Sequence, residues 1–318
     1  MWNPATVQIW RNPQQVPADL GRTVVVVGNF DGVHLGHQQV IAEARECAQD
    51  LGVERLVAVT FDPHPMAVLR PEHAPVSLTT IEARAEMLAG FGVDDVFVVH
   101  FDNDVAGWSP EQFVREVLVE TLHARAVVVG ANFRFGAKAA GDVAKLRELG
   151  AIYDFEVLGV ALEGGPQVWS STYIRTCLAA GDVEGAALAL GHPYFVRGVV
   201  ELGDQRGRLL GFPTANVPTR GLAAPADGVY AGWLTRLDTG QRYPAAISVG
   251  TNPTFDGVRN RRVEAYCLDR DDLELYGVEV EIAFVSRIRG MVKFEGVPAL
   301  IETMKGDVQH TREELGLP

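Results

Sequence analysis

The sequence predicts a doubly wound α/β domain followed by an antiparallel β-barrel with C-terminal helices. In the first part of the chain, continuous apolar strand patterns alternate with helical patterns, which is typical of a parallel sheet covered on both faces. After Gly191 the strand patterns follow one another through glycine- and proline-rich loops, as in antiparallel barrels. The length of 318 residues and the hydrophobic fraction of 47% suffice for two domains with real cores. We therefore expect one domain over residues 1–187 and a second over residues 188–318.

Strands and helices alternate regularly along the first domain. The strands are expected at residues 23–28, 55–61, 95–101, 125–130 and 153–160. The helices are expected at residues 36–51, 80–89, 110–121, 142–149, 171–179 and 183–190. Parallel neighbours need a long crossover connection, and these helices provide it. The alternation indicates a doubly wound sheet, in which ligands bind at the carboxyl ends of the strands.

The second domain shows strand patterns joined by loops instead of helices. The strands are expected at residues 194–203, 228–237, 242–249, 262–269 and 278–288. Two helices are expected at the end of the chain, at residues 295–305 and 307–315. Because loops without helices join antiparallel neighbours, this pattern favours an antiparallel barrel.

The composition excludes several classes of protein. The formal net charge is −13, whereas binding to a nucleic-acid backbone needs a basic patch. The three cysteines (Cys47, Cys177 and Cys267) lie far apart, which indicates neither a zinc knuckle nor a disulfide framework and fits a reducing cytoplasm. No apolar run approaches the roughly 20 residues of a membrane span. We expect a soluble cytoplasmic protein without nucleic-acid or membrane partners, and the sequence leaves its oligomeric state open.

Residues 24–37, with the sequence VVVVGNFDGVHLGH, carry the clearest chemical signal. A buried strand is expected to end at Gly28 and a helix to open near Gly36, so that free backbone N–H groups and the helix dipole point at one place. The glycines of this turn let a phosphate approach the backbone closely. His34 and His37 lie three residues apart on one side of the first helical turn, where both can donate to phosphate oxygens.

Two other interpretations of the histidine pair stay open. The imidazoles could ligate a metal, although no third ligand is obvious, or they could cap the helix. The segment lacks the Lys-Ser/Thr of an ATP-binding P-loop and the Gly-x-Gly-x-x-Gly of a dinucleotide site. His-x-Gly-His resembles instead the motif of the nucleotidylyltransferase superfamily, which implies that both histidines stabilise the α- and β-phosphates of ATP during adenylyl transfer.

Three further segments support an adenylyl-transfer site in the first domain. Residues 60–65, TFDPHP, follow the second expected strand. Residues 130–136, GANFRFG, follow a later strand, and their two phenylalanines either frame a planar ring or belong to the core. Residues 169–175, WSSTYIR, open a helix, where hydroxyls either cap the helix or bind phosphate. Arg175, one turn into that helix, adds a fixed charge for a triphosphate.

The second chemical signal is the glycine- and arginine-rich segment at residues 203–216, GDQRGRLLGFPTAN. Such a loop can wrap phosphates through backbone N–H groups and through Arg206 or Arg208. Thr214 and Asn216 stand two residues apart on an extended chain, so their oxygens can face one Mg²⁺, which prefers hard oxygen ligands. The alternative is an ordinary hairpin loop.

Glu264 lies in an expected strand among apolar and aromatic neighbours. A lone carboxylate in such a place is a candidate general base for a substrate hydroxyl. The alternative is an exposed strand residue that pairs with an arginine.

Taken together, these segments resemble the family of bacterial bifunctional riboflavin kinase/FMN adenylyltransferases over nearly the full chain. The motifs of the first half are GNFDGVHLGH (28–37), FDPHP (61–65), NFRFG (132–136) and SSTYIR (170–175). The motifs of the second half are GFPTAN (211–216), GVY (228–230), GTNPTF (250–255) and YG (276–277). Pro-Thr-Ala-Asn is highly specific for riboflavin kinases, and here it follows an adenylyltransferase-like half.

The resemblance implies a nucleotidylyltransferase-like domain that converts FMN to FAD and a riboflavin-kinase barrel that makes FMN. ATP and the flavins riboflavin, FMN and FAD are the implied substrates and products, with Mg²⁺ as cofactor. The implied catalytic residues are Glu264 as general base of the kinase, and His34, His37 and Arg175 in adenylyl transfer. The implied metal ligands are Thr214 and Asn216. The residues implied to bind substrate or nucleotide are Gly28, Phe30, Asp31, Gly36, His64, Asn132, Ser171, Thr172, Gly203, Arg206, Arg208, Gly211 and Arg289.

The sequence departs from the family pattern at three positions. Val168 stands where the family has an arginine, Leu69 where an aromatic residue is frequent, and Met291 where the family has an acid. Two competing functions follow, namely an enzyme in which only the kinase half is active and a non-catalytic, flavin-responsive binding protein. The intact His34 and Glu264 favour the bifunctional enzyme, because a binding protein needs neither phosphate-stabilising histidines nor a base.

Overall fold

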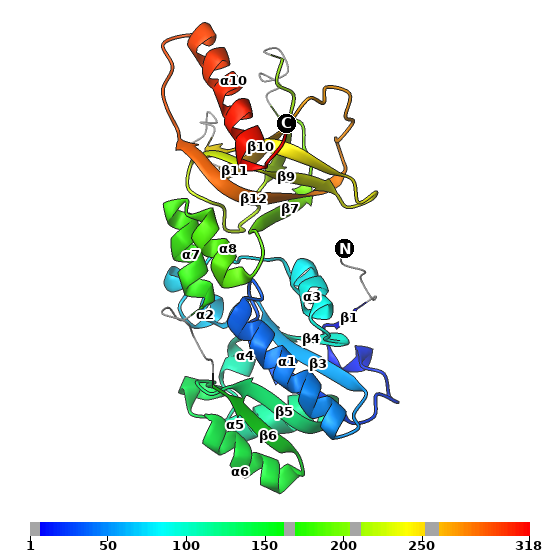
Figure 1. The fold of residues 1–318 in the computed structure, drawn as a ribbon. Coiled ribbons are helices and arrows are strands. Elements are labelled where there is room, and N and C mark those ends of the chain that lie inside the picture. Colours follow the sequence, from blue (N-terminus) through cyan, green and yellow to red (C-terminus); the bar gives the residue numbers. More distant parts are fainter. Residues whose placement is uncertain (1–6, 162–168, 204–210, 252–260) are drawn as a thin grey trace. The chain divides into compact units, whose positions relative to one another are not determined.

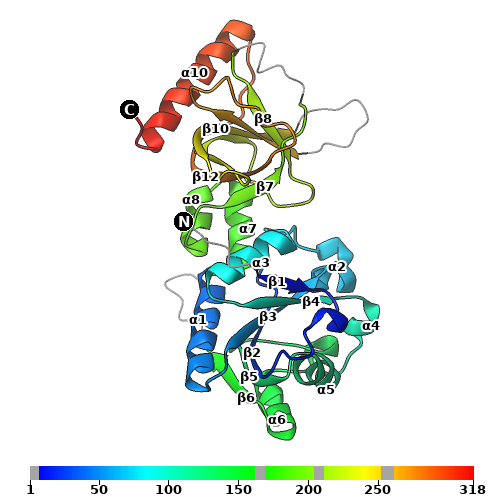
Figure 2. The same cartoon turned by 90° about the vertical axis from the view of Figure 1, so that its right-hand side faces the viewer.

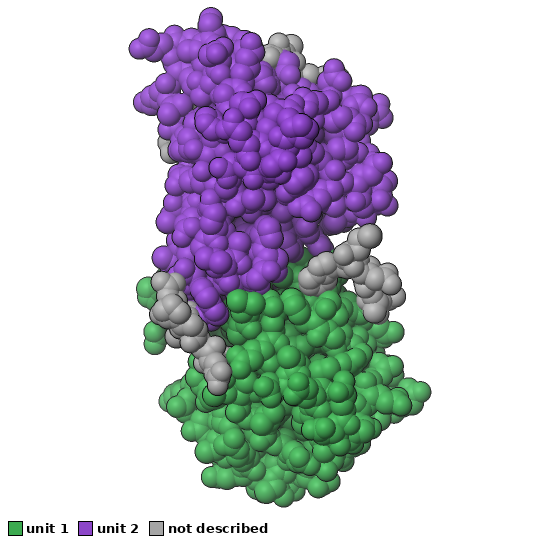
Figure 3. Space-filling model, viewed as in Figure 1, with its two compact units in different colours: residues 1–75, 80–168 green, residues 76–79, 169–318 purple. Residues whose placement is uncertain are grey.

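The computed structural model describes residues 7–161, 169–203, 211–251 and 261–318 (Figure 1). The chain forms two compact units. Unit 1 comprises Met1–Pro75 and Thr80–Val168, and unit 2 comprises Val76–Thr79 and Trp169–Pro318 (Figure 3). Unit 2 therefore takes a short segment from the middle of the sequence of unit 1.

Unit 1 is built on a six-stranded sheet with the order β1-β4-β3-β2-β5-β6, in which every pair of neighbours is parallel. The strands are β1 (Gln8–Trp10), β2 (Thr23–Val27), β3 (Arg55–Asp62), β4 (Asp95–His100), β5 (Ala124–Gly130) and β6 (Glu156–Val160). The strand order reverses between β2 and β5, and the crevice outside their carboxyl ends is where such sheets bind ligands.

Helices cover both faces of this sheet (Figure 2). The helices of unit 1 are α1 (Leu35–Asp50), α2 (Pro65–Leu69), α3 (Ile81–Gly90), α4 (Asn103–Ala106), α5 (Pro110–Phe113), the π-helix η3 (Val114–Thr121) and α6 (Val143–Tyr153). Helix α1 packs against β2, β3 and β5, and α3 packs against β4. On the other face, Val25 and Val127 of the sheet share a core with Phe113, Leu118 and Leu146. All five residues of β2 are buried, which explains its unbroken apolar run.

Unit 2 is an antiparallel, nearly closed barrel with the strand order β7-β12-β9-β10-β11-β8. The strands are β7 (Phe195–Val199), β8 (Thr214–Pro218), β9 (Gly228–Arg236), β10 (Arg242–Thr251), β11 (Arg261–Cys267) and β12 (Glu279–Gly290). A bridge between Glu201 and Asn216 links the chain just after β7 to β8 and so brings the two edges together. The predicted fold class, a doubly wound domain followed by an antiparallel barrel, is confirmed.

Within the described residues, three helices complete unit 2. They are α7 (Ser171–Ala180), α8 (Val183–Leu190) and α10 (Val297–Glu314). Ile174 and Leu178 of α7 and Leu190 of α8 share the apolar core with barrel side chains such as Ile247. Leu78, from the segment that unit 2 takes from earlier in the chain, is buried in the same core.

The structure corrects several element boundaries. The two helices predicted at residues 295–305 and 307–315 are one helix, α10, because Gly306 keeps a helical conformation in its interior. The strand predicted to start at Tyr153 starts at Glu156, since α6 runs through Tyr153 and Asp154 ends it in the left-handed conformation. Strands β1 and β8 were not predicted as strands: β1 has only three residues, and β8 begins in the segment that was interpreted as a phosphate-binding loop. Across the described parts of the chain, no helix has the length and apolar character to cross a membrane.

Candidate active sites

The turn between β2 and α1 has an unusual backbone. Gly32 has a φ of 85°, and the non-glycine residues Phe30 and Val33 have φ values of 48° and 42°. These left-handed conformations are sparsely populated for side-chain-bearing residues and persist only where the surroundings hold them. The Phe30 ring is buried beneath the turn, and a Cβ on Gly28 would lie 3.2 Å from it. Gly28 therefore makes room for the ring that fixes the turn.

His34 and His37 leave this turn as a stacked pair. Their ring centroids are 3.7 Å apart with an angle of 22° between the planes, and the Phe30 ring meets His37 edge-on at 5.1 Å. The Nδ1 atoms of both histidines are buried and have no hydrogen-bond partner among the residues that the structure describes. Buried polar atoms are nearly always paired, so two neighbouring ones without a partner indicate a place for a ligand.

Both imidazoles are neutral at pH 7. Burial lowers the pKa of His34 to about 4, although the carboxylate of Asp31 opposes this shift. Burial also holds the pKa of His37 well below its usual range, with smaller contributions in the same direction from His34 and Arg84. Each neutral ring has one N–H donor and one acceptor nitrogen. The described residues include no group of three or more His, Cys, Asp or Glu side chains that could hold a metal ion, so the metal interpretation of the histidine pair finds no third ligand of these types there.

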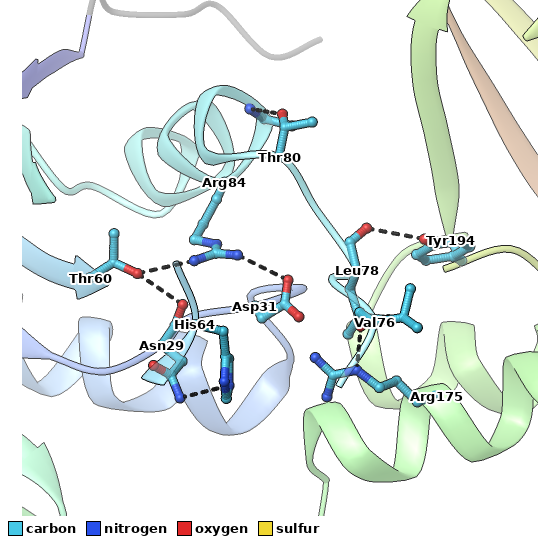
Figure 4. A network of polar contacts seen from close by, with 11 residues as sticks. Asn29, Asp31, Thr60, His64, Val76, Leu78, Thr80, Arg84, Arg175 and Tyr194 are labelled. Atoms are coloured by element: carbon cyan, nitrogen blue, oxygen red, sulfur yellow. Dashed lines mark hydrogen bonds and ion pairs between the residues drawn. The ribbon is translucent and has the colours of Figure 1, made fainter. Parts of the chain in front are cut away.

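His64 lies beside the same turn. Its Nε2 atom is 3.2 Å from the Asn29 amide nitrogen (Figure 4). Its Nδ1 atom accepts a hydrogen bond from the Met66 backbone at the start of α2. The structure thus brings the FDPHP segment to the GNFDGVHLGH segment, as expected from their places at the carboxyl ends of β3 and β2. Asp31 is buried and pairs with Arg84, which the sequence did not single out.

The segment after β5 divides into a core part and an exposed part. Phe133 and Phe135 stack with centroids 5.4 Å apart, and both pack in the apolar core of unit 1. These contacts favour the core interpretation of the two aromatic rings. Asn132 is exposed at the carboxyl end of β5.

Ser171, Thr172 and Arg175 lie on α7 in unit 2. The cap of this helix is Ser170, whose Oγ accepts from the Tyr173 backbone N–H at 3.1 Å. Arg175 Nε donates to the Val76 carbonyl at 2.7 Å, within the same unit (Figure 4). The cap accounts for Ser170, and a joint site of the other three residues with the histidines stays a prediction.

The candidate kinase residues are neighbours across two strands. In the pairing of β8 with β11, Asn216 lies opposite Glu264 and Thr214 lies opposite Tyr266. Opposite residues share a face of the sheet and have Cβ atoms about 5 Å apart. Thr214, Asn216 and Glu264 therefore project from one face, the first two because they are two residues apart.

The side-chain oxygen of Asn216 is in a position to coordinate a cation. Its side chain is buried, and its Oδ1 atom makes no hydrogen bond within the described ranges of the chain. Gly203 packs against the amide, since a Cβ on Gly203 would lie 2.5 Å from Asn216 Nδ2. A hard, unpaired oxygen held in place in this way fits a divalent cation such as Mg²⁺.

A cavity of about 500 Å³ opens at this strand edge. Gly203, Thr214 and Asn216 line one part of it, and residues 270–276 line another. The latter carry Asp271, Asp272 and Glu274 and end at Tyr276 of the YG motif. The size is that of an ordinary small-molecule pocket.

The remaining predicted residues have different surroundings. Gly211 has a φ of 85°, which favours glycine. Arg289 donates to both carboxylate oxygens of Asp307, at 2.7 and 2.6 Å, and so joins β12 to α10. Arg206 and Arg208 lie outside the described residues. Gly36 is buried in the first turn of α1.

Replacing Gly203 by alanine tests the site around Asn216. The new methyl group would displace the Asn216 amide, so the phosphoryl transfer that the sequence predicts for this site is expected to slow about 10- to 100-fold. The measurement is the rate of phosphate transfer from ATP. Gly306→Ala is the matched control, because no atom lies within 4 Å of its added Cβ. Equal rates in the two variants would contradict a role for the Asn216 position.

Acidification from pH 6.5 towards pH 4 is expected to destabilise unit 1. The unfolded chain protonates its histidines near pH 6.5, whereas folding holds the pKa of His34 at about 4. The stability is therefore complete above pH 6.5 and falls as the pH drops, by up to about 1.4 kcal/mol per pH unit for one such group. Thermal unfolding of the wild type and of His34→Gln at several pH values measures this, and the variant should show the shallower dependence. If the stabilities of the wild type and of His34→Gln depended on pH in the same way, the burial of a neutral His34 would be contradicted.

Comparisons with known proteins identify a family for each half of the chain. Residues 16–172 match the model of the FAD synthetase family, and residues 190–315 match that of the riboflavin kinase family. A bifunctional riboflavin kinase/FMN adenylyltransferase from Listeria monocytogenes is 38% identical over 98% of this chain and 95% of its own. Proteins of the same description from Escherichia coli and Bacillus subtilis are 35% and 34% identical, and the alignments cover 92% and 96% of this chain and 93% and 96% of theirs. A solved structure from Streptococcus pneumoniae, described as a macrolide-efflux protein, superposes with a TM-score of 0.85 at 31% identity, over 96% of this chain and 98% of that one.

Proposed function

The chain belongs to the family of bifunctional riboflavin kinase/FMN adenylyltransferases, and we propose that its two activities use the two sites described above. It phosphorylates riboflavin to FMN and adenylylates FMN to FAD, with ATP as the donor in both reactions. The assignment of residues to each reaction is our proposal. The observation that carries it is the cross-strand pairing of Glu264 with Asn216, which is one of the residues that line the cavity in unit 2.

In the kinase site, Glu264 accepts the proton of the ribityl 5′-hydroxyl as that oxygen attacks the γ-phosphorus of ATP. The new oxygen–phosphorus bond gives FMN, and the bond to the β-phosphate oxygen breaks to release ADP. Support comes from the position of Glu264 directly opposite Asn216, which itself lines the cavity. Phosphoryl transfer depends mainly on positioning and charge stabilisation, and one aligned base is sufficient protein chemistry.

Thr214 and Asn216 would hold Mg²⁺ in this site. The unpaired and buried Oδ1 atom of Asn216 and the common face of both side chains fit a hard cation. When bound, Mg²⁺ neutralises charge on the phosphates of the nucleotide. Both residues offer neutral oxygens only, so they hold the metal together with the nucleotide and bind it weakly alone.

In the adenylyl-transfer site, a phosphate oxygen of FMN attacks the α-phosphorus of ATP, and the bond to the bridging oxygen of the β-phosphate breaks to release pyrophosphate. The FMN phosphate is already an anion, so no base is needed. His34 and His37 donate N–H groups to the phosphates, and their unpaired Nδ1 atoms support this role. We propose Ser171, Thr172 and Arg175 as a further clamp on the phosphates. The other residues that we propose to contact substrate or nucleotide are Gly28, Phe30, Asp31, Gly36, His64, Asn132, Gly203, Arg206, Arg208, Gly211 and Arg289.

The division of the two activities between residues 1–187 and 188–318 is part of this proposal. The two matched family ranges, 16–172 and 190–315, lie on either side of that boundary and support it. We also propose a cytoplasmic location, because both reactions consume ATP and the chain has no cysteine pattern that needs an oxidising compartment.

The proposal is tested by incubating the protein with riboflavin, ATP and Mg²⁺ and separating the flavins by chromatography. The expected result is FMN followed by FAD, with pyrophosphate released in step with FAD. Removal of Mg²⁺ by a chelator should stop FMN formation. If only FMN accumulates, the protein is a riboflavin kinase without adenylyltransferase activity. If flavin binds but is not converted, the protein is a non-catalytic binding protein.

A further inference from the structure

Arg84 is a charged side chain in a place where charges are rarely found. It lies on α3, whose first turn is capped by Thr80 through a hydrogen bond from the Ala83 backbone. The Arg84 side chain is only 7% exposed to solvent. A guanidinium is almost never buried to this extent unless specific partners compensate for its lost hydration.

Arg84 holds the turn that precedes the histidines at two residues, Asp31 directly and Asn29 through Thr60 (Figure 4). Its Nη2 atom donates to Asp31 Oδ1 at 3.1 Å, and the Asp31 side chain is 2% exposed. Its Nη1 atom donates to Thr60 Oγ1 at 3.1 Å, and Thr60 in turn donates to the Asn29 carbonyl at 2.9 Å. One planar, two-pronged group therefore fixes Asn29 and Asp31 at the same time.

This turn needs such support. Phe30, between the two residues that Arg84 holds, has a left-handed backbone, and Val33 does as well. Left-handed conformations in residues with a Cβ persist only where contacts outweigh their strain. His34 follows Asp31 by three residues, and the His34 and His37 rings are stacked on each other. A shift of the turn would therefore displace both rings.

We propose that Arg84 is a positioning residue for adenylyl transfer. It holds the turn of residues 29–31, and thereby both histidines, in the orientation that meets the developing phosphate charge. Its positive charge also disfavours protonation of His37, which keeps a neutral acceptor and donor in the site. The inference rests on the proposed role of the two histidines. A second Arg–Asp pair in the same unit provides a comparison. Arg45 lies 3.0 Å from Asp94, and each of these two side chains is more than a third exposed to solvent.

The test measures FAD formation from supplied FMN and ATP. The Arg84→Met substitution alone would leave the Asp31 carboxylate buried without its cation, which is strongly destabilising. One variant is therefore Arg84→Met with Asp31→Asn, which removes both charges at nearly constant volume. Because Asp31 is also a proposed contact of the substrate, the deciding variant is Thr60→Val, which leaves Asp31 in place. We expect the kcat of the double variant to fall about 100-fold. The KM of Thr60→Val for ATP should stay within about threefold of the wild type, because a misplaced group loses transition-state stabilisation and not ground-state binding.

Three single variants complete the test. Thr60→Val keeps the ion pair and removes the hydroxyl that links Arg84 to Asn29, and its kcat should fall about tenfold. Arg84→Lys keeps a charge beside Asp31 but lacks the second prong that reaches Thr60, so its kcat should also fall about tenfold. Arg45→Met should leave kcat unchanged, and FMN formation should be unchanged in all of these proteins.

The outcomes separate the inference from the proposed function. A folded double variant with the kcat of the wild type would overturn the inference, as would an unchanged kcat in Thr60→Val. A drop of similar size in Arg45→Met would assign the effect to general stability and overturn it as well. If the wild type forms FAD but His34→Ala forms it equally fast, the proposed role of the histidines fails, whatever the Arg84 variants show.

Discussion

His37→Ala is expected to slow FAD formation from FMN and ATP by about 10²- to 10³-fold and to leave FMN formation unchanged. The substitution removes one of two stacked imidazoles whose buried nitrogen has no protein partner in the described structure. Loss of one preorganised donor to developing phosphate charge typically costs this much in rate. Given riboflavin, ATP and Mg²⁺, the variant should accumulate FMN, which chromatography of the flavins measures directly.

The matched control for this variant is His123→Ala. His123 is exposed just before β5, at the amino edge of the sheet in unit 1, opposite the edge that bears the turn. It should form FAD at the rate of the wild type. If His37→Ala abolished FMN formation while circular dichroism showed a folded protein, the assignment of separate sites to the two reactions would be wrong.

Glu264→Ala is expected to slow riboflavin phosphorylation by at least about 10²-fold, because the ribityl hydroxyl then loses its proton acceptor during attack. Adenylylation of supplied FMN should survive, since His34 and His37 belong to unit 1 and Glu264 belongs to unit 2. The two rates are measured separately, with riboflavin and with FMN as the flavin.

Glu279→Ala controls for the loss of a barrel carboxylate. Glu279 is exposed at the start of β12 and is not among the residues that we propose for the site. Its variant should phosphorylate riboflavin normally. A Glu264→Ala protein with the wild-type rate of phosphorylation would contradict the assignment of the base.

Local sequence patterns predicted those parts of the sites that local geometry controls. The spacing of His34 and His37 predicted that both lie on one side of a helical turn, and their rings are indeed stacked. The spacing of Thr214 and Asn216 predicted a common face, which β8 confirms. Pairing of β8 with β11 is a long-range property, and no local pattern could have placed Glu264 opposite Asn216.

The sequence did not reveal features that depend on distant parts of the chain. Arg84 stands between Glu82 and Glu86 in a helical pattern, so nothing in the sequence indicated that this one of the three charges is buried. Gly306 was interpreted as a helix break, but packing of α10 against β9, β10 and β12 keeps the helix continuous. Tertiary contacts overrode the local preference there.

The segment Val76–Thr79 has a consequence for how this gene can be recombined. Leu78 is 1% exposed in the core of unit 2, and its carbonyl accepts a hydrogen bond from the Tyr194 hydroxyl at 3.0 Å. In gene order, residues 80–168 are thus an insertion within the sequence of unit 2. A chimera that joins two parental genes at a single crossover near residue 168 would place a foreign Leu78 segment in that core. Exchange of the kinase unit between relatives therefore requires three junctions, so that residues 76–79 travel with residues 169–318.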